Sequence, residues 1–396
     1  MRIVAWNFNL IIKIFQGFDM GVDKLNKIYQ LFAPCIPVKG YSRSMIVDIN
    51  RHKIHYIPNS LYEIIKNNTT KTLSQIVRKY GEEARPILLE YFNFLESNEL
   101  IFSVEHFELI RFPKMSLHWD FYSICANAVL DICTNSRYNI HQTLQKLNDI
   151  HCFHIQIRIF KNLTDTHELE SLIKFAHNLS FRSIQIIIRL IPNIADLYYS
   201  ELVKKYIKLT KLEVFNAHEN NVIQIYGLYN VVIFHKKALQ NKSQCGCVDA
   251  QYFPVNMNHF TESQHFNTCL NRKIAIDENG EIKNCPSMEK SFGNIAKDSL
   301  IDILQNPEFK VLWKIRKDDI DVCKDCEHRY ICTDCRCYIK NTNEIYSQPE
   351  KCTYNPYIAK WENEEGYIPV ELWRIQNITW ENKAKRMPLV KKTLRT

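Results

Sequence analysis

Residues 323–338 read CKDCEHRYICTDCRCY, so five of the fourteen cysteines of this 396-residue chain fall within sixteen positions. A C-x2-C pair puts two thiolates in one tight turn, where both can reach the same metal. A chain of this size, rich in clustered cysteines and without a convincing secretion signal, favours metal binding over disulfides. We therefore expect a cytoplasmic protein whose C-terminal part is built around metal sites.

More cysteines flank this stretch. Cys269 and Cys285 enclose the segment IAIDENGEI (274–282), which predicts a β-hairpin turning at Asn279–Gly280 and so brings the two thiols together. Cys352 follows after a loop. Four thiolates suit either a tetrahedral zinc ion or an iron–sulfur cluster, and spacing alone does not separate the two. Four other cysteines stand alone in apolar runs and are expected to behave as small buried hydrophobes: Cys35, Cys125, Cys133 and Cys152.

The bulk composition is that of a globular protein, with 46% hydrophobic and 24% charged residues. The length suggests two or three domains. The net charge of +8 is too diffuse to favour nucleic acid, and no apolar run approaches the ~18 residues that cross a bilayer. We therefore expect no nucleic-acid partner and no membrane insertion. The apolar, weakly basic residues 1–18 are interpreted as an amphipathic element, or as upstream sequence from a mis-called start, rather than as a signal peptide.

The first domain is expected over residues 1–112. The stretch SMIVDINRHKIHYI (44–57) has two alternating apolar runs around a polar turn, which predicts a hairpin. Helices are predicted at 58–67, 69–81 and 82–100, and two short strands within 101–112. A hairpin, three helices and a second hairpin make a winged-helix-like module.

The second domain is expected over residues 113–244, where strands and helices alternate. Strands are predicted at 127–133, 153–160, 182–190, 211–216 and 230–235, and helices at 139–150, 165–179 and 197–209. This order predicts βαβ units in an open parallel sheet or partial barrel, so the fold class is α/β. In the third domain, 245–396, cysteines and turns replace periodicity, apart from one helix predicted from Ser299 to about Lys317 with a break at Pro307.

The order C-x10-G-x4-C, C-x2-C-x5-C-x2-C and a final cysteine is similar to the SPASM domain of radical S-adenosylmethionine peptide-modifying enzymes. That resemblance implies one or two auxiliary [4Fe-4S] clusters, with zinc kept as the alternative metal. Cys337 has no place in the pattern. The resemblance implies one cluster on Cys323, Cys326, Cys332 and Cys352, and a second on Cys269, Cys285 and Cys335 with Cys247 (or Cys245) as the fourth ligand.

Radical chemistry in that superfamily uses a C-x3-C-x2-C motif after the first barrel strand, and the sequence contains no such motif. No glycine lies between Gly81 and Gly227 to let a cofactor approach the backbone closely. The middle domain therefore resembles a degenerate partial β/α barrel of the radical-SAM type. We do not expect S-adenosylmethionine to be bound or cleaved.

Beyond the cysteines, LFAPCIPVKGYSRSMIVDINRHKIHYIPNSLYEII (31–65) and CRCYIK (335–340) resemble the SPASM-domain peptide maturase of grasp-with-spasm systems. This implies maturation of a ribosomally synthesised precursor peptide, with an ATP-grasp ligase as a further partner. The first hairpin would bind the leader by strand addition. Two functions stay open, a peptide maturase whose reaction is undefined and a non-catalytic delivery scaffold whose metal sites are structural. The candidate peptide-binding residues are Val47, Asp48, Ile49, Ile54 and Tyr56.

Overall fold

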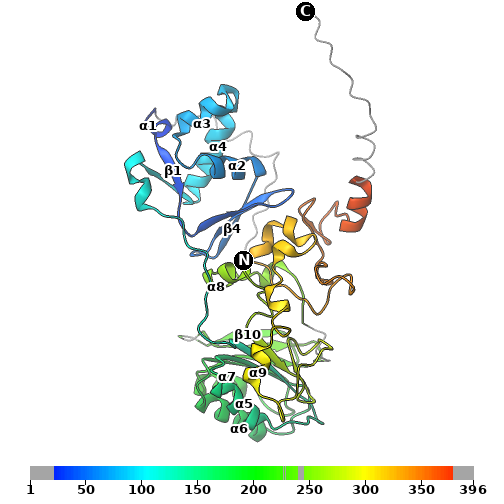
Figure 1. Ribbon diagram of the computed structural model, residues 1–396. Coiled ribbons are helices and arrows are strands. Elements are labelled where there is room, and N and C mark those ends of the chain that lie inside the picture. The colour runs from blue at the N-terminus through cyan, green and yellow to red at the C-terminus, as the bar shows by residue number, and fades with distance from the viewer. Residues whose placement is uncertain (1–21, 226, 228, 240–244, 378–396) are drawn as a thin grey trace, which may run out of the picture.

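The computed structural model describes residues 22–225, 227, 229–239 and 245–377, and the amphipathic element expected at residues 1–18 lies outside them. Figure 1 shows an N-terminal module at one end, a sheet domain at the other, and a cysteine-rich segment between them. The protein is α/β, with a mixed and mostly parallel main sheet. No helix within the described ranges is long and apolar enough to cross a membrane.

The N-terminal module is a three-stranded antiparallel sheet followed by three helices. The strands lie in the order β2 (Cys35–Val38), β3 (Ser44–Asp48) and β4 (Lys53–Ile57), so the predicted hairpin is confirmed as β3–β4. The helices are α2 (Asn59–Asn67), α3 (Leu73–Tyr80) and α4 (Arg85–Ser97), close to their predicted bounds. Helix α3 begins with a capping box between Thr72 and Gln75. It ends at Gly81, whose φ of 96° favours glycine.

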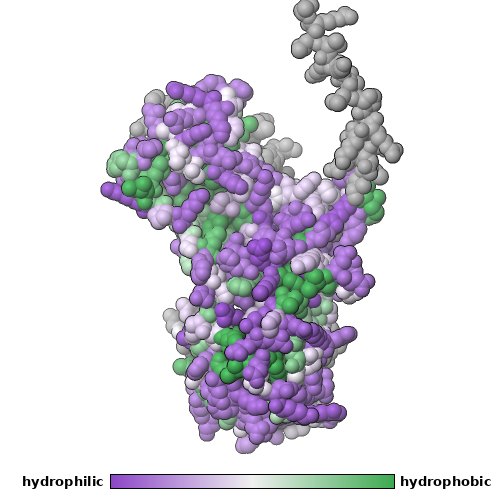
Figure 2. Space-filling view, in the orientation of Figure 1, coloured by the Kyte–Doolittle hydropathy of each residue, from purple (hydrophilic) through white to green (hydrophobic). Residues whose placement is uncertain are grey.

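The second predicted hairpin is wrong. Strand β5 (Ile101–Val104) pairs with β1 (Ile28–Leu31), after the short helix α1 (Val22–Leu25), and His106–Arg111 form the 3-10 helix η2. The Glu108 carboxylate accepts the backbone N–H of Glu105 at 3.0 Å, a capping box that starts a helical turn instead of a strand. Apolar side chains of η2 reach a surface that Figure 2 shows as mostly hydrophilic, with Phe107 69% and Ile110 89% exposed.

Both faces of the β2–β3–β4 sheet are covered. Ile46 points to α2, α3 and α4 and joins the apolar cluster that includes Leu61. Met45 and Val47 point the other way and pack with Ile331 of the cysteine-rich segment. Because successive strand residues face opposite sides, one sheet holds the helices on one face and the metal-binding segment on the other.

The main sheet has eight strands in the order β10-β11-β9-β8-β7-β6-β12-β13. The pairs from β11 to β12 are all parallel, and only the two outer pairs are antiparallel. The five strands predicted in the middle domain are confirmed as β6 (Asn127–Ile132), β7 (His154–Ile159), β8 (Ser183–Arg189), β9 (Leu209–Phe215) and β11 (Val231–His235), and the others are β10 (Asn221–Gln224), β12 (Lys273–Ile276) and β13 (Ile282–Lys283).

One face of this sheet packs on the helices α5 (Ile140–Asp149), α6 (His167–Asn178) and α7 (Asp196–Lys205). Leu130, Ile157 and Ile186 on that face are fully buried. The opposite face carries polar groups, among them Asp131, whose carboxylate accepts two hydrogen bonds from Arg158 at 2.7 and 2.8 Å. The polar face is therefore the one turned away from the apolar core.

The main sheet continues into the predicted third domain. Strand β12 lies in that domain and is the sixth parallel strand of the sheet, beside β6. The hairpin β12–β13 is confirmed. Its turn is a wider loop in which the Asp277 carboxylate accepts the backbone N–H groups of Asn279 and Glu281.

The helix predicted through Lys317 is too long, because α9 (Leu300–Gln305) ends before Pro307 and the chain then turns. The rest of the segment is short elements: η4 (Ala250–Tyr252), α8 (Met257–Ser263), η5 (Leu312–Lys314), η6 (Lys317–Asp319), η7 (Cys323–Asp325), η8 (Glu327–Tyr330), β14 (Tyr354–Asn355) and β15 (Lys360–Trp361).

Candidate metal centres

Four of the cysteines expected to hold a cluster line one pocket. Cys323 begins η7, Cys326 lies between η7 and η8, and Cys332 follows η8. Because side chains three apart in a 3-10 turn point the same way, Cys323 and Cys326 face the pocket together. The fourth is delivered from a distant loop, held by a bridge between Val248 and Cys352. We call this group set one: Cys323, Cys326, Cys332 and Cys352.

The thiols of set one lie in a water-poor environment. Burial raises the pKa of Cys323 to about 12 and that of Cys332 to about 11, and it also raises the pKa of Cys326. The sulfur of Cys352 lies close enough to raise each of them further. Metal binding at set one must therefore displace protons from thiols that hold them tightly, which makes metal affinity depend on pH.

A second group of thiols gathers at the polar face of the main sheet. Cys285 is hydrogen-bonded to both Cys245 and Cys337. Cys245 acts to lower the pKa of Cys285, but Cys337 and burial outweigh it and raise that pKa to about 11. Arg158 lies near Cys245 and Cys285. We call this group set two: Cys245, Cys269, Cys285, Cys335 and Cys337.

Set two therefore offers five thiols. Cys245 and Cys247 are both exposed residues, but it is the Cys245 thiol that contacts Cys285. Between them, Gly246 has a φ of 85°, and a Cβ there would lie 2.9 Å from the Cys335 sulfur. Only glycine lets the backbone pass so close to that sulfur. Sequence reasoning did not single out this glycine, and it gave Cys337 no ligand position.

The spacing of the sulfur atoms bears on which metal fits. Within the described ranges, the one group of three metal-binding side chains with all ligand atoms inside 4.8 Å is Cys326, Glu327 and His328. No three cysteine sulfurs there are that close. Tetrahedral zinc, with zinc–sulfur bonds of about 2.3 Å, needs its sulfurs roughly 4 Å apart. The described cysteines therefore do not form the compact tetrahedral arrangement that zinc needs, whereas four thiolates are also the ligand set of an iron–sulfur cluster.

Each set has one lysine against a cysteine sulfur. Lys317 Nζ lies 3.7 Å from the Cys332 sulfur in set one, and Lys273 Nζ lies 3.6 Å from the Cys269 sulfur in set two. Burial acts to lower the pKa of Lys317, but the nearby sulfurs and Asp334 outweigh it and hold that pKa above its ordinary value. Sequence reasoning missed both lysines, since neither belongs to a cysteine motif.

A buried polar network joins set one to the N-terminal sheet. His328, 1% exposed, lies with Nε2 2.7 Å from the Tyr56 hydroxyl and Nδ1 3.8 Å from the Cys326 sulfur. The neighbouring Glu327, fully buried, accepts hydrogen bonds from Arg43 at 2.7 Å and from Tyr354 at 2.5 Å. Burial lowers the pKa of His328 to about 4, so this imidazole is neutral at pH 7.

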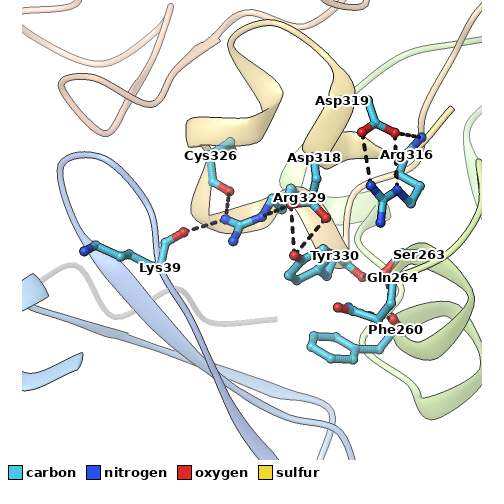
Figure 3. Close-up of polar contacts among 10 residues, drawn as sticks. All are labelled: Lys39, Phe260, Ser263, Gln264, Arg316, Asp318, Asp319, Cys326, Arg329 and Tyr330. Atoms are coloured by element: carbon cyan, nitrogen blue, oxygen red, sulfur yellow. Dashed lines mark hydrogen bonds and ion pairs between the residues drawn. The ribbon is translucent and has the colours of Figure 1, made fainter. Parts of the chain in front are cut away.

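Arg329 makes a second connection, shown in Figure 3. Its guanidinium donates to the Lys39 carbonyl of the N-terminal module at 2.5 Å and to the Cys326 carbonyl at 2.9 Å. Asp318 accepts from Arg329 and from the Tyr330 hydroxyl, both at 2.9 Å. The turn that carries Cys326 is therefore fixed directly to the module that precedes the main sheet.

The structure separates the five candidate peptide-binding residues. Val47 and Asp48 lie on β3, which is paired on both sides, and Ile49 follows it; all three are buried. Ile54 and Tyr56 lie on β4, the last strand of this sheet in the described part of the chain. Of the two strands that carry these residues, only β4 lies at an edge of the sheet and can offer main-chain groups to a further strand; the other edge is β2.

Of the lone cysteines, Cys35, Cys125 and Cys152 are buried in apolar clusters as predicted, whereas Cys133 is only half-buried.

Comparison with family models finds one match, to the SPASM iron–sulfur cluster-binding domain over residues 268–327. A search of curated proteins finds no match. The solved structures that resemble the chain include two crystal structures, each at 11% sequence identity. Streptococcus suis SuiB bound to S-adenosylmethionine has a TM-score of 0.34, over 81% of this chain and 98% of that one. Streptococcus suis SuiB bound to the precursor peptide SuiA has a TM-score of 0.31, over 78% and 96%. The matched segment contains Cys269, Cys285, Cys323 and Cys326, so both sets draw ligand candidates from an iron–sulfur-binding domain.

Proposed function

We propose that this chain is a precursor-peptide-binding iron–sulfur protein of ribosomal peptide maturation, which holds two [4Fe-4S] clusters and receives the peptide at β4. The observation that carries the proposal is the hydrogen bond between Tyr56, on β4, and His328, which also lies against the Cys326 sulfur. A peptide added to β4 would lie beside the cysteine-rich segment. The match of residues 268–327 to an iron–sulfur-binding domain supports the metal.

For the first cluster we propose the four cysteines of set one. For the second we propose Cys269, Cys285, Cys335 and Cys245. Cys245 is preferred to Cys247 because its thiol contacts Cys285. Cys337, the other neighbour of Cys285, is the reserve candidate for the same position.

For the peptide we propose strand addition at the outer edge of β4, where main-chain hydrogen bonds give affinity and side-chain contacts give selectivity. His55 of β4 faces Phe94 of α4, with ring centroids 6.3 Å apart, so α4 would form one wall of the binding site. Ile54 and Tyr56 face the cysteine-rich segment and would form the other. An exposed Lys53 and a partly exposed Arg51 would attract an acidic leader. The chain would act on the bound peptide, or present it, beside an ATP-grasp ligase.

The test uses the full chain, purified without oxygen, and a synthetic leader segment of the precursor peptide encoded beside it. Iron and acid-labile sulfide should each approach about eight per chain. Ile54→Pro and His55→Pro are compared, because N–H groups along an edge strand point alternately toward β3 and toward the open edge. The proline that removes an outward N–H should spare the fold, judged by iron content and circular dichroism, yet abolish leader binding. Two zinc ions without sulfide, or full leader binding by both folded proline variants, would defeat the corresponding half of the proposal.

A delivery scaffold with structural clusters is the second candidate, and one observation favours it. Set one lies at the contact between the N-terminal sheet and the cysteine-rich segment, with Cys332 in the same apolar cluster as Val47. A cluster there would stabilise the junction whether or not it reacts. Turnover of the precursor peptide by the iron-loaded chain, with and without the ligase, distinguishes the two candidates by mass spectrometry.

A further inference from the structure

Two lysines from different parts of the fold stand in the same relation to the two cysteine sets. Lys317 begins η6 and lies 3.7 Å from Cys332 of set one. Lys273 begins β12 and lies 3.6 Å from Cys269 of set two. The two lysines share no sequence motif and no type of secondary structure. We therefore attribute the repeated geometry to a shared requirement of the two cysteine sets for a positive charge beside a ligand sulfur.

The charges around Lys317 do not balance without an anion at set one. Lys317 is 5% exposed, and its nearest carboxylate, Asp334, is 3.7 Å away. That carboxylate is already paired with the buried Arg336, whose guanidinium lies at 2.7 Å, and accepts from Asn267 at 2.6 Å. One buried carboxylate thus faces two buried cations. A buried charge without a counter-charge is costly, so we expect negative charge on the sulfur ligands of set one to balance the surplus positive charge of Lys317.

Set two shows the same surplus. Arg158 lies near it, but Asp131 binds that guanidinium through two hydrogen bonds and balances its charge. Glu262 lies near Lys273 and accepts a hydrogen bond from the Asn271 side-chain amide at 2.8 Å. Lys273 Nζ donates to the Cys269 sulfur at 3.6 Å, so its charge is directed at the ligands of set two.

We propose that Lys317 and Lys273 are the dedicated cations of the two clusters, each donating an N–H to a ligand sulfur and so raising the reduction potential of the cluster beside it. The proposal rests on the iron–sulfur part of the proposed function. A cluster held by four thiolates is negatively charged, and it takes up one electron, and a further negative charge, from a low-potential donor. A fixed cation stabilises the reduced form more than the oxidised form, and hydrogen bonds to the sulfurs act in the same direction.

The experiment measures the midpoint potential of each cluster in the full chain, by titration with dithionite followed by electron paramagnetic resonance. Lys317→Met and Lys273→Met should each lower the potential of one cluster only, reducing its equilibrium constant for reduction at least tenfold, or about 59 mV for one electron. Two matched controls remove exposed lysines that are close in sequence to Cys323 and Cys285: Lys324→Met in η7, and Lys290→Met, whose partner is Glu308. The controls should leave both potentials unchanged.

Arginine replacements keep the positive charge. They show whether a Met variant that loses its cluster does so because the charge is missing or because the packing has changed. Iron retained in Lys317→Arg but lost in Lys317→Met supports the proposal, and equal loss in both overturns it in favour of simple packing. Unchanged potentials in iron-loaded Lys317→Met and Lys273→Met overturn it as well. If the unaltered chain takes up no iron or sulfide, the proposed function itself is overturned. The unaltered chain therefore distinguishes that failure from a failure of the lysine proposal, which is read only in the variants.

Discussion

Replacing Arg43 by methionine tests how the N-terminal module is held on the cysteine-rich segment. Arg43 Nε lies 2.7 Å from the carboxylate of Glu327, which is fully buried, and the guanidinium sits 3.7 Å above the Tyr56 ring. Burial acts to raise the pKa of Glu327, but positive charge close by, that of Arg43 included, holds it below its ordinary value. Without Arg43 the buried carboxylate keeps only Tyr354 among these partners.

The expected loss follows from this geometry. Removing one partner of a buried ion pair costs about 3–5 kcal/mol, and the lost cation–π contact adds about 0.5–1 kcal/mol. Because the Arg43 side chain is 31% exposed, we take the lower end and expect a loss of about 3 kcal/mol in the free energy of unfolding. That corresponds to roughly a 150-fold change in the ratio of folded to unfolded chain.

The assay is urea unfolding followed by circular dichroism, read at the first transition because a chain of several modules need not unfold in one step. Lys24→Met is the control, since its pair with Glu96 spans 2.7 Å but both side chains are more than 40% exposed, and it should cost less than about 1 kcal/mol. Arg43→Met combined with Glu327→Gln should recover part of the loss. If Arg43→Met costs no more than Lys24→Met, the carboxylate of Glu327 does not depend on Arg43 and the reasoning is refuted.

Three further outcomes are expected. Burial raises the pKa of Glu262 to about 7, so between about pH 4.5 and 7 the folded chain holds a proton that the unfolded chain releases. The free energy of unfolding should therefore fall by up to about 3 kcal/mol as the pH rises through this range. An equally steep fall in Glu262→Gln would contradict this assignment. Cys326→Ser should lose about four irons and destabilise the cysteine-rich segment, whereas Cys247→Ser should keep its iron, and equal losses would show the ligand assignment to be wrong. The reduced, iron-loaded chain should release no 5′-deoxyadenosine from S-adenosylmethionine above background, and substantial release by purified protein would reveal a radical site that the cysteine spacing does not show.

Sequence periodicity was sufficient to predict strands that bury only one face. The alternating run in β8 buries Ile184, Ile186 and Ile188 on the helix side, and a period of two predicted that strand directly. It failed where local hydrogen bonds decide, as in η2, whose apolar residues read as a strand until the capping box at Glu105 is seen. It failed also for β2, an edge strand that tolerates Pro37.

The candidate site divides in the same way. The spacing C-x2-C anticipated that Cys323 and Cys326 would face one pocket, because a single turn is enough to bring them together. The neighbours of Cys285 were foreseen only in part: the resemblance offered Cys245 as an alternative to Cys247, whereas the pattern gave Cys337 no place, and both thiols arrive from separate loops. Lys273 and Lys317 carry no local signal at all, because their proximity to sulfur depends on how β12 and η6 pack in the finished fold.

The position of β12 fixes an order of events during synthesis. Lys273 of β12 pairs with Asn127 of β6, so β6 stays an open edge while the intervening chain leaves the ribosome. An unpaired edge strand is a target for wrong partners, and closing so long a loop is slow. Cys269 and Cys285 flank this late hairpin, so set two assembles only once the sheet is complete. A metal cluster bound at that stage would stabilise the completed sheet. Iron starvation should therefore leave aggregated nascent protein rather than a stable iron-free form.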